Sequence, residues 1–140
     1  RILAWPRVGA KTAPPPHRDA GIRPAIITGR TSELLLRRAR ELSIELIYQG
    51  REDKGTALEE LRSDLGLRYE EIAYVGDDLP DLAAIRAAGL GITVANGHHF
   101  VARHADWQTR AAGGSGAVRE IAELILMAQG KLNDALEQYL

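Results

Sequence analysis

The sequence predicts an α/β domain built on a Rossmann-like, doubly wound parallel sheet. Two observations predict this fold: short apolar runs alternate with longer segments of helical spacing, and the runs are apolar throughout, as in strands covered on both faces. The 140 residues are 45% apolar, which is enough to bury the core of one domain without disulfides or a structural metal. A single domain is therefore expected.

Two strand and helix units come first. Residues 25–28 form an apolar run that ends at a glycine, and a Thr-Ser pair then precedes the helical spacing of residues 33–42. Residues 45–48 form a second apolar run. The helix predicted after it, residues 54–65, carries apolar side chains on one face and is closed by Gly66.

The second half of the chain continues this alternation. Residues 72–75 and 91–95 are two further strand runs, and the helix predicted between them, residues 79–88, ends at a glycine. A weaker fifth strand is expected at residues 106–109. The apolar spacing of residues 117–128 predicts a long helix.

The two ends of the chain are predicted to lie outside this domain. Residues 1–20 have neither helical nor strand period and contain Pro6 and a run of three prolines, so no core element is expected there. We therefore divide the chain into an irregular N-terminal segment (1–20), an α/β domain (21–130) and a polar C-terminal tail (131–140).

The composition points to no macromolecular partner. With 18 basic and 19 acidic residues, the chain has no net field to attract nucleic acid or an anionic membrane, so an anionic ligand needs a local site. There is no cysteine, which excludes a thiolate zinc site and a cysteine nucleophile. No apolar run approaches the roughly 20 residues of a membrane span, and we expect a cytoplasmic protein.

The candidate functional residues follow predicted strands, where the loops of a doubly wound sheet meet the starts of the next helices. Thr28 ends the first strand, and its hydroxyl, with the backbone N–H groups of Gly29 and Arg30, can face an anion. The alternative is a simple turn before a helix. Lys54 opens the next helix, where a cation is unfavourable unless an anion lies nearby. The alternative there is an exposed lysine paired with Glu52 or Asp53.

Three carboxylates, Asp77, Asp78 and Asp81, follow the third predicted strand. Like charges this close repel one another, and Mg²⁺ relieves the repulsion while using oxygen ligands. The alternative is an acidic turn in which Asp78 or Asp81 caps the next helix, and capping is compatible with metal binding. His98, after the fourth strand, is interpreted as a hydrogen-bonding loop residue rather than a catalyst.

Longer stretches of sequence surround these residues. They are residues 20–30 (AGIRPAIITGR), 48–50 (YQG), 53–54 (DK), 73–81 (AYVGDDLPD), 105–106 (AD), 113–120 (GGSGAVRE) and 128–131 (AQGK). In these stretches, from about residue 20 to the end, the chain resembles the 3-deoxy-D-manno-octulosonate 8-phosphate phosphatases. These are small capless members of the haloacid dehalogenase superfamily.

This resemblance implies a haloacid dehalogenase fold and Mg²⁺-dependent hydrolysis of a phosphorylated eight-carbon sugar acid, a step in making the lipopolysaccharide core. A nine-carbon sugar acid phosphate is an alternative substrate that stays open. If the N-terminal part is intact, the resemblance also implies a homotetramer in which the tail of one subunit reaches toward the active site of its neighbour. Lys131 in that tail would then contact substrate, and a solvated lysine is the alternative.

The resemblance also assigns roles to residues at the matching motif positions. Thr28 and Gly29 would bind phosphoryl oxygens, and Arg30 would contact phosphate or the sugar carboxylate. Lys54 would neutralise charge on the phosphoryl group and on the nucleophile.

The aspartates take the metal-related roles in the same comparison. Asp77 would be the Mg²⁺ ligand with Asp78 beside it. Asp81 would lie behind them and hold Lys54 or a metal-bound water.

The family's nucleophile has no counterpart in this sequence. The family uses an Asp-x-Asp-Gly stretch after its first strand, with the first aspartate as nucleophile and the second as acid and base. No Asp-x-Asp occurs before Thr28, and Asp19 is the single aspartate in that region. We therefore expect the N-terminal strand to be absent or replaced and the activity to be impaired. Two interpretations stay open: a first segment replaced by unrelated sequence, as after a frameshift, and a pseudoenzyme that binds Mg²⁺ and phosphate without catalysis.

Overall fold

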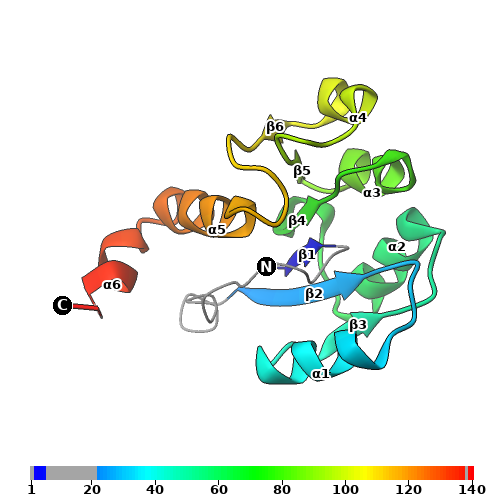
Figure 1. The fold of residues 1–140 in the computed structure, drawn as a ribbon, viewed down its shortest axis with the longest axis horizontal. Coiled ribbons are helices and arrows are strands. Elements are labelled where there is room, and N and C mark those ends of the chain that lie inside the picture. Colours follow the sequence, from blue (N-terminus) through cyan, green and yellow to red (C-terminus); the bar gives the residue numbers. More distant parts are fainter. Residues whose placement is uncertain (1, 6–21, 138) are drawn as a thin grey trace.

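The structure is a computed structural model that describes residues 2–5, 22–137 and 139–140. Over these residues, six strands form one sheet in the order β3-β2-β1-β4-β5-β6, and every neighbouring pair runs parallel (Figure 1). This arrangement confirms the predicted α/β class with a doubly wound parallel sheet, because the order reverses direction at β1.

Each predicted strand and helix lies within a few residues of an observed element, whereas β1 and α4 were not predicted. The strands are β1 (Ile2–Trp5), β2 (Arg23–Ile27), β3 (Leu46–Tyr48), β4 (Ile72–Val75), β5 (Leu90–Thr93) and β6 (Trp107–Gln108). The helices are α1 (Glu33–Glu41), α2 (Lys54–Asp64), α3 (Leu82–Ala87), α4 (His99–His104), α5 (Ala117–Ala128) and α6 (Leu132–Glu137), with short 3₁₀ turns η1 (Tyr69–Glu71) and η2 (Leu79–Asp81).

The strand β1 corrects one expectation from the sequence. It lies between β2 and β4, with Leu3 level with Pro24 on one side and with Ala73 on the other. The expectation that residues 1–20 hold no core element is therefore wrong for these four residues, and residues 6–20 lie outside the described part of the chain. Ile-Leu-Ala-Trp is a continuous apolar run, but it is too short to show a period, and its pairing partners are distant in sequence.

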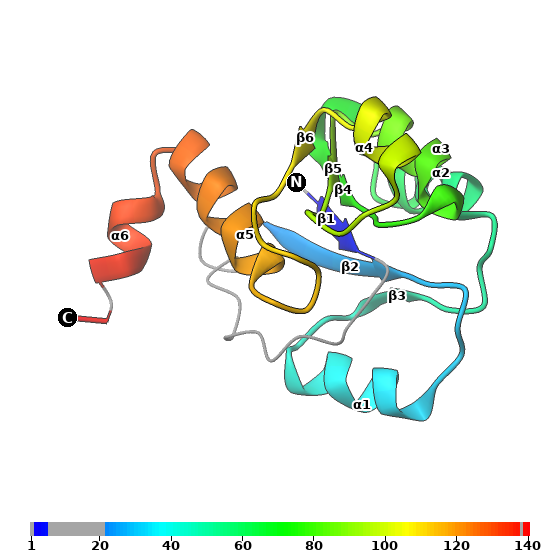
Figure 2. The same cartoon turned by 45° about the horizontal axis from the view of Figure 1, so that its top comes forward.

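Helices cover both faces of the sheet, as the apolar strands require. On one face α2, α3 and α4 contribute Leu58, Ile85 and Val101 to a buried cluster. On the other face α1 and α5 pack against a second cluster that includes Ile92 and Ile121 (Figure 2). Helix α6 follows α5 and extends away from the sheet, as Figure 1 shows.

Polar side chains cap the starts of two helical elements that follow strands. Ser32 caps α1 by accepting a hydrogen bond from the Leu35 N–H, as its sequence position predicts. Asp78 caps η2 in the same way and accepts from the Leu79 N–H.

None of the helices in the described ranges is both long and apolar enough to cross a membrane.

Candidate phosphate and metal site

The carboxyl ends of the parallel strands gather at one edge of the sheet, and the predicted site residues lie there. Thr28 follows β2, and Asp77 follows β4 after a single glycine. Because β1 lies between these two strands, Thr28 and Asp77 are separated by about two strand spacings, roughly 10 Å. The candidate site therefore spans the carboxyl end of β1.

The turn after β2 is held by Thr28. This residue is 5% exposed, its N–H donates to the Tyr48 carbonyl (2.9 Å), and its carbonyl accepts from the Arg51 N–H (2.9 Å). The Arg30 N–H donates to Thr28 Oγ1 (3.1 Å). Among the described residues the Thr28 hydroxyl accepts this bond and donates none, so its hydrogen is available to an anion.

The other two members of this motif differ in exposure. The Arg30 side chain is exposed, which leaves it at the rim of the site. A Cβ at Gly29 would collide with the Glu52 carboxylate, so this carboxylate lies directly against the turn. The tip of a glutamate can turn away, so this contact does not by itself require glycine.

Asp81 is the centre of the site. Its carboxylate is fully buried, and four donors among the described residues surround it: Lys54 Nζ and the Tyr74 hydroxyl at Oδ1, both at 2.8 Å, and the N–H groups of Asp77 and Asp78 at Oδ2, at 3.0 and 3.2 Å. The Lys54 side chain is 11% exposed. One buried carboxylate therefore ties α2 to the loop after β4.

Tyr74 is a partner that the sequence interpretation missed. Burial raises the pKa of its phenol, and the negative charges of Asp81 and Asp77 raise the pKa further. The hydroxyl consequently stays protonated and remains a donor to Asp81. A tyrosine in a buried strand needs a partner for its hydroxyl, and this requirement was the signal available in the sequence.

The glycine before the aspartates is fixed by the same carboxylate. A Cβ at Gly76 would collide with Cβ and Cγ of Asp81. Because Asp81 is anchored by its hydrogen bonds, it has nowhere to move. The stretch from Gly76 to Asp81 therefore folds back on itself as one unit.

The structure separates the roles of the two candidate metal ligands. Asp78 is exposed, and its carboxylate caps η2. Asp77 is half-buried, and its carbonyl accepts from the His98 N–H (2.8 Å). The His98 ring accepts from the Phe100 N–H at Nδ1 (3.1 Å), which agrees with its interpretation as a loop residue.

The donor set fits Mg²⁺ in type. Among the residues that the structure describes, no three His, Asp or Glu side chains converge on one point. Mg²⁺ does not require such a cage, because it is commonly held by one or two carboxylates together with waters and substrate phosphate. Asp77 and Asp78 can supply those carboxylates, while Asp81 is occupied by Lys54.

The contacts of Lys54 decide between its two interpretations. Lys54 pairs with Asp81, and the acidic residue before it, Asp53, pairs with Arg51 instead. The alternative of an exposed surface lysine is therefore wrong.

Lys131 lies exposed between α5 and α6, away from this cluster in the chain.

These features and the sequence of the domain identify its family. Residues 26–121 match the haloacid dehalogenase-like hydrolases, and the chain belongs to that family. It is 46% identical over 114 residues to 3-deoxy-D-manno-octulosonate 8-phosphate phosphatase KdsC of Escherichia coli K12, which covers 81% of this chain and 61% of that protein. The chain thus spans less than two thirds of the length of this relative.

Two solved structures are similar over nearly the whole chain. One is the phosphatase of the same name from Moraxella catarrhalis, in complex with a magnesium ion, a phosphate ion and KDO (TM-score 0.92, 38% identity, 99% of this chain and 92% of that chain). The other is the cobalt-bound phosphatase from Haemophilus influenzae (TM-score 0.85, 32% identity, 94% and 90%). Both relatives were solved with a bound metal.

Proposed function

We propose that this chain forms the phosphate- and Mg²⁺-binding half of a phosphatase for 3-deoxy-D-manno-octulosonate 8-phosphate, with its own hydrolytic activity impaired. One observation carries the proposal. The buried pair of Lys54 and Asp81 holds an ammonium group beside the loop that carries Asp77, at the same sheet edge as the Thr28 hydroxyl. The similarity to the Moraxella catarrhalis complex supports the choice of ligands.

Each residue has a chemical task in this proposal. The Thr28 hydroxyl and the Gly29 N–H donate to phosphoryl oxygens, while the Arg30 N–H donates to Thr28 Oγ1 within the turn. Lys54 stabilises the negative charge that phosphoryl transfer leaves on those oxygens, and Asp81 keeps its ammonium group in place. Asp77 and Asp78 would hold Mg²⁺, which supplies further charge neutralisation when bound.

The impairment follows from the residues after β1. The residues following Trp5 are Pro6, Arg7, Val8 and Gly9, and the first acidic residue of the chain is Asp19. A carboxylate nucleophile would have to stand between Thr28 and Asp77, at the end of β1. The sequence supplies none there.

The same residues offer a direct test. Pro6→Asp with Val8→Asp creates an Asp-x-Asp-Gly stretch immediately after β1, because Gly9 is already present. We expect negligible Mg²⁺-dependent release of phosphate by the unmodified chain. The double variant should release it roughly 10³-fold faster or more, a part of the ~10⁶ that a nucleophile can contribute.

The matched control is Pro6→Asn with Val8→Asp. Asparagine has nearly the size and shape of aspartate but no carboxylate to act as nucleophile, so this control should stay inactive. Robust hydrolysis by the unmodified chain would sink the claim of impairment. Equal inactivity of all three proteins would argue against placing the nucleophile directly after β1.

A non-catalytic module that binds Mg²⁺ and phosphate is the second candidate. The observation that favours it is the absence of acidic residues from positions 1–18 beside an otherwise well-formed site. Calorimetric titration distinguishes the two: binding of phosphate with Mg²⁺, without restored hydrolysis in the double variant, supports the module. A nine-carbon sugar acid phosphate is tested as a substrate in the same assay.

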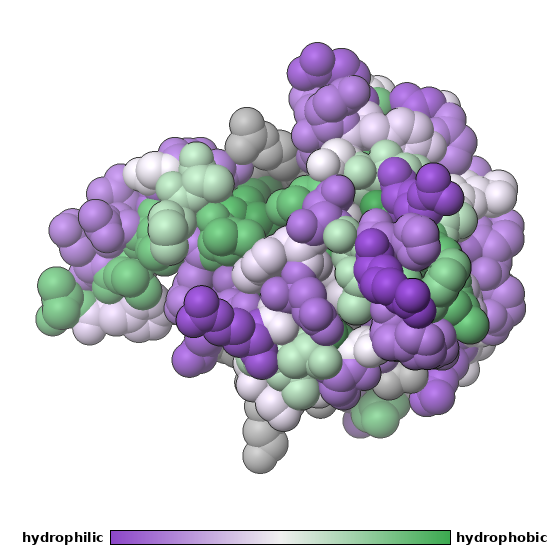
Figure 3. Space-filling view, turned by 90° about the horizontal axis from the view of Figure 1, so that it is seen from above, coloured by the Kyte–Doolittle hydropathy of each residue, from purple (hydrophilic) through white to green (hydrophobic). Residues whose placement is uncertain are grey.

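We further propose, from the family, a cytoplasmic location and, for a chain whose N-terminal part is intact, a homotetrameric assembly. Apolar residues gather along α5 and α6 in Figure 3, and Met127, Leu136 and Tyr139 are exposed there, which supports a subunit contact. Light scattering measures the assembly directly. A monomer at micromolar concentration would contradict it.

A further inference from the structure

Arg51 lies in the loop between β3 and α2 and contacts both elements that are proposed to bind phosphate. Its backbone N–H donates to the Thr28 carbonyl (2.9 Å), which holds the turn after β2. The Gly50 N–H donates to the Arg30 carbonyl (3.4 Å) and strengthens the same connection. Backbone hydrogen bonds thus join this loop to the turn after β2 that contains Thr28.

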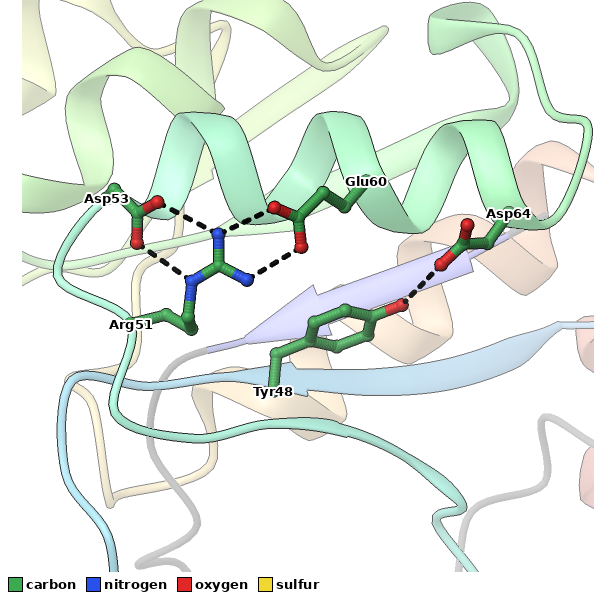
Figure 4. A network of polar contacts seen from close by, with 5 residues as sticks. All are labelled: Tyr48, Arg51, Asp53, Glu60 and Asp64. Atoms are coloured by element: carbon green, nitrogen blue, oxygen red, sulfur yellow. Dashed lines mark hydrogen bonds and ion pairs between the residues drawn. The ribbon is translucent and has the colours of Figure 1, made fainter.

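The side chain of Arg51 fastens the loop to the helix. Its Nε and Nη2 donate to the Asp53 carboxylate at 2.9 and 2.8 Å, and Nη1 and Nη2 donate to Glu60 at 2.7 and 3.0 Å (Figure 4). Asp53 directly precedes Lys54, and Glu60 lies on α2. The guanidinium group therefore binds α2 at two places: at its start through Asp53, and further along the helix through Glu60.

The start of α2 is joined to two loops: Lys54 ties it to the loop after β4 through Asp81, and Arg51 ties it to the turn after β2. Asp53 occupies the capping position but makes no capping hydrogen bond with its side chain, because that carboxylate faces Arg51. Hydrogen bonds from Arg51 lower the pKa of both Asp53 and Glu60, so both carboxylates stay ionised at neutral pH. The planar fork of arginine binds each of the two carboxylates through two hydrogen bonds, whereas the ammonium group of a lysine acts as a point charge and lacks this geometry.

We propose that Arg51 is a positioning residue that sets the distance between the Thr28 hydroxyl and the Lys54 ammonium group. Arg51 holds the turn of Thr28 through its backbone and the helix that carries Lys54 through its side chain, while Asp81 holds the ammonium group itself. Two donors that act on the same phosphate must keep a fixed separation, and small displacements cost much of their effect. This inference rests on the proposed phosphate-binding function.

The test measures the affinity for inorganic phosphate in the presence of Mg²⁺, by calorimetry on the full chain. Arg51→Ala and Arg51→Lys should each weaken phosphate binding about tenfold, as the loss of supporting contacts around a site commonly does. The matched control is Arg62→Ala, because Arg62 makes a similar fork with Glu59 at the other end of α2 (2.7 and 2.5 Å). The control should lose stability but keep its phosphate affinity.

Chemical rescue separates positioning from general stability. Low millimolar guanidinium, far below denaturing concentrations, should restore phosphate affinity to Arg51→Ala, whereas ammonium should not. If phosphate binds the unmodified chain and Arg51→Ala equally well, Arg51 is not a positioning residue and the proposed function stands. If Arg62→Ala weakens binding as much as Arg51→Ala does, the effect is general loss of stability and the inference fails. If the unmodified chain binds no phosphate, the proposed function fails and the inference falls with it.

Discussion

Replacing Asp81 with asparagine removes the charge that balances Lys54 inside the domain. Breaking a buried ion pair by removing one partner typically costs about 3–5 kcal/mol, because the other charge stays buried without compensation. Here Lys54 keeps 11% of its surface in water, which favours the lower end of that range. The asparagine amide must also turn an N–H₂ group toward some of the donors that the carboxylate accepted from.

We therefore expect a loss of about 3–4 kcal/mol, a large share of the roughly 5–15 kcal/mol that stabilises a typical domain. For a domain of this size the loss corresponds to a decrease in Tm of roughly 10 °C. Urea unfolding followed by circular dichroism measures it, and the dependence on urea concentration should keep its slope.

A second substitution tests the physical reason. In the Asp81→Asn background, Lys54→Met removes the uncompensated ammonium group and should recover part of the lost stability. A loss below about 1 kcal/mol in the single variant, or no recovery in the double variant, would refute the view that a buried charge pair anchors the site.

Two further predictions concern the loop after β5 and the surface of α2. A Cβ at Gly97 would collide with the hydroxyl of Thr93, so Gly97→Ala should cost about 1–3 kcal/mol in the same unfolding assay. Thr93→Ala should relieve part of that cost, because a Cβ there would still lie 3.0 Å from the Val94 carbonyl oxygen. Costs that simply add in the double variant would contradict the clash with Thr93. Hydrogen bonding from Arg62 lowers the pKa of Glu59 from 4.5 to about 2. The native chain should therefore be more stable than Glu59→Gln above pH 4.5, and this difference in stability should fade as the pH falls toward about 2. A difference in Tm that persists near pH 2 would contradict this role of the ionised Glu59.

Most of the fold could be predicted from local patterns. The apolar runs at β2, β4 and β5 are strong because each is bounded by a glycine or a helix start, which local sequence reveals. β1 could not be found in this way, because four apolar residues followed by proline carry little local information. Its place in the sheet is set by hydrogen bonds to β2 and β4 on either side.

The site could be predicted where the topology alone sets the position. Thr28, Lys54 and Asp77 each follow a strand, so a parallel sheet brings them to one edge without further information. The partners of these residues could not be predicted with the same ease. Arg51 reaches Glu60 across nine positions in a conformation that only the folded loop defines.

The strand β1 shows that the fold and the chemistry depend on different features of one segment. β1 joins the sheet through backbone hydrogen bonds, and its sequence is an apolar run like those of its buried neighbours, so the pairing places no requirement on the residues that follow. A nucleophile in those following residues would contribute to catalysis without contributing to the sheet. Restoring Asp-x-Asp-Gly at positions 6–9 should consequently change the rate of hydrolysis by orders of magnitude while leaving the pairing of β1 intact. The rate of hydrolysis and the free energy of unfolding, both measured on that one variant, separate the contribution to catalysis from the contribution to the sheet. A loss of stability as large as that expected from losing a strand would mean that β1 had been displaced.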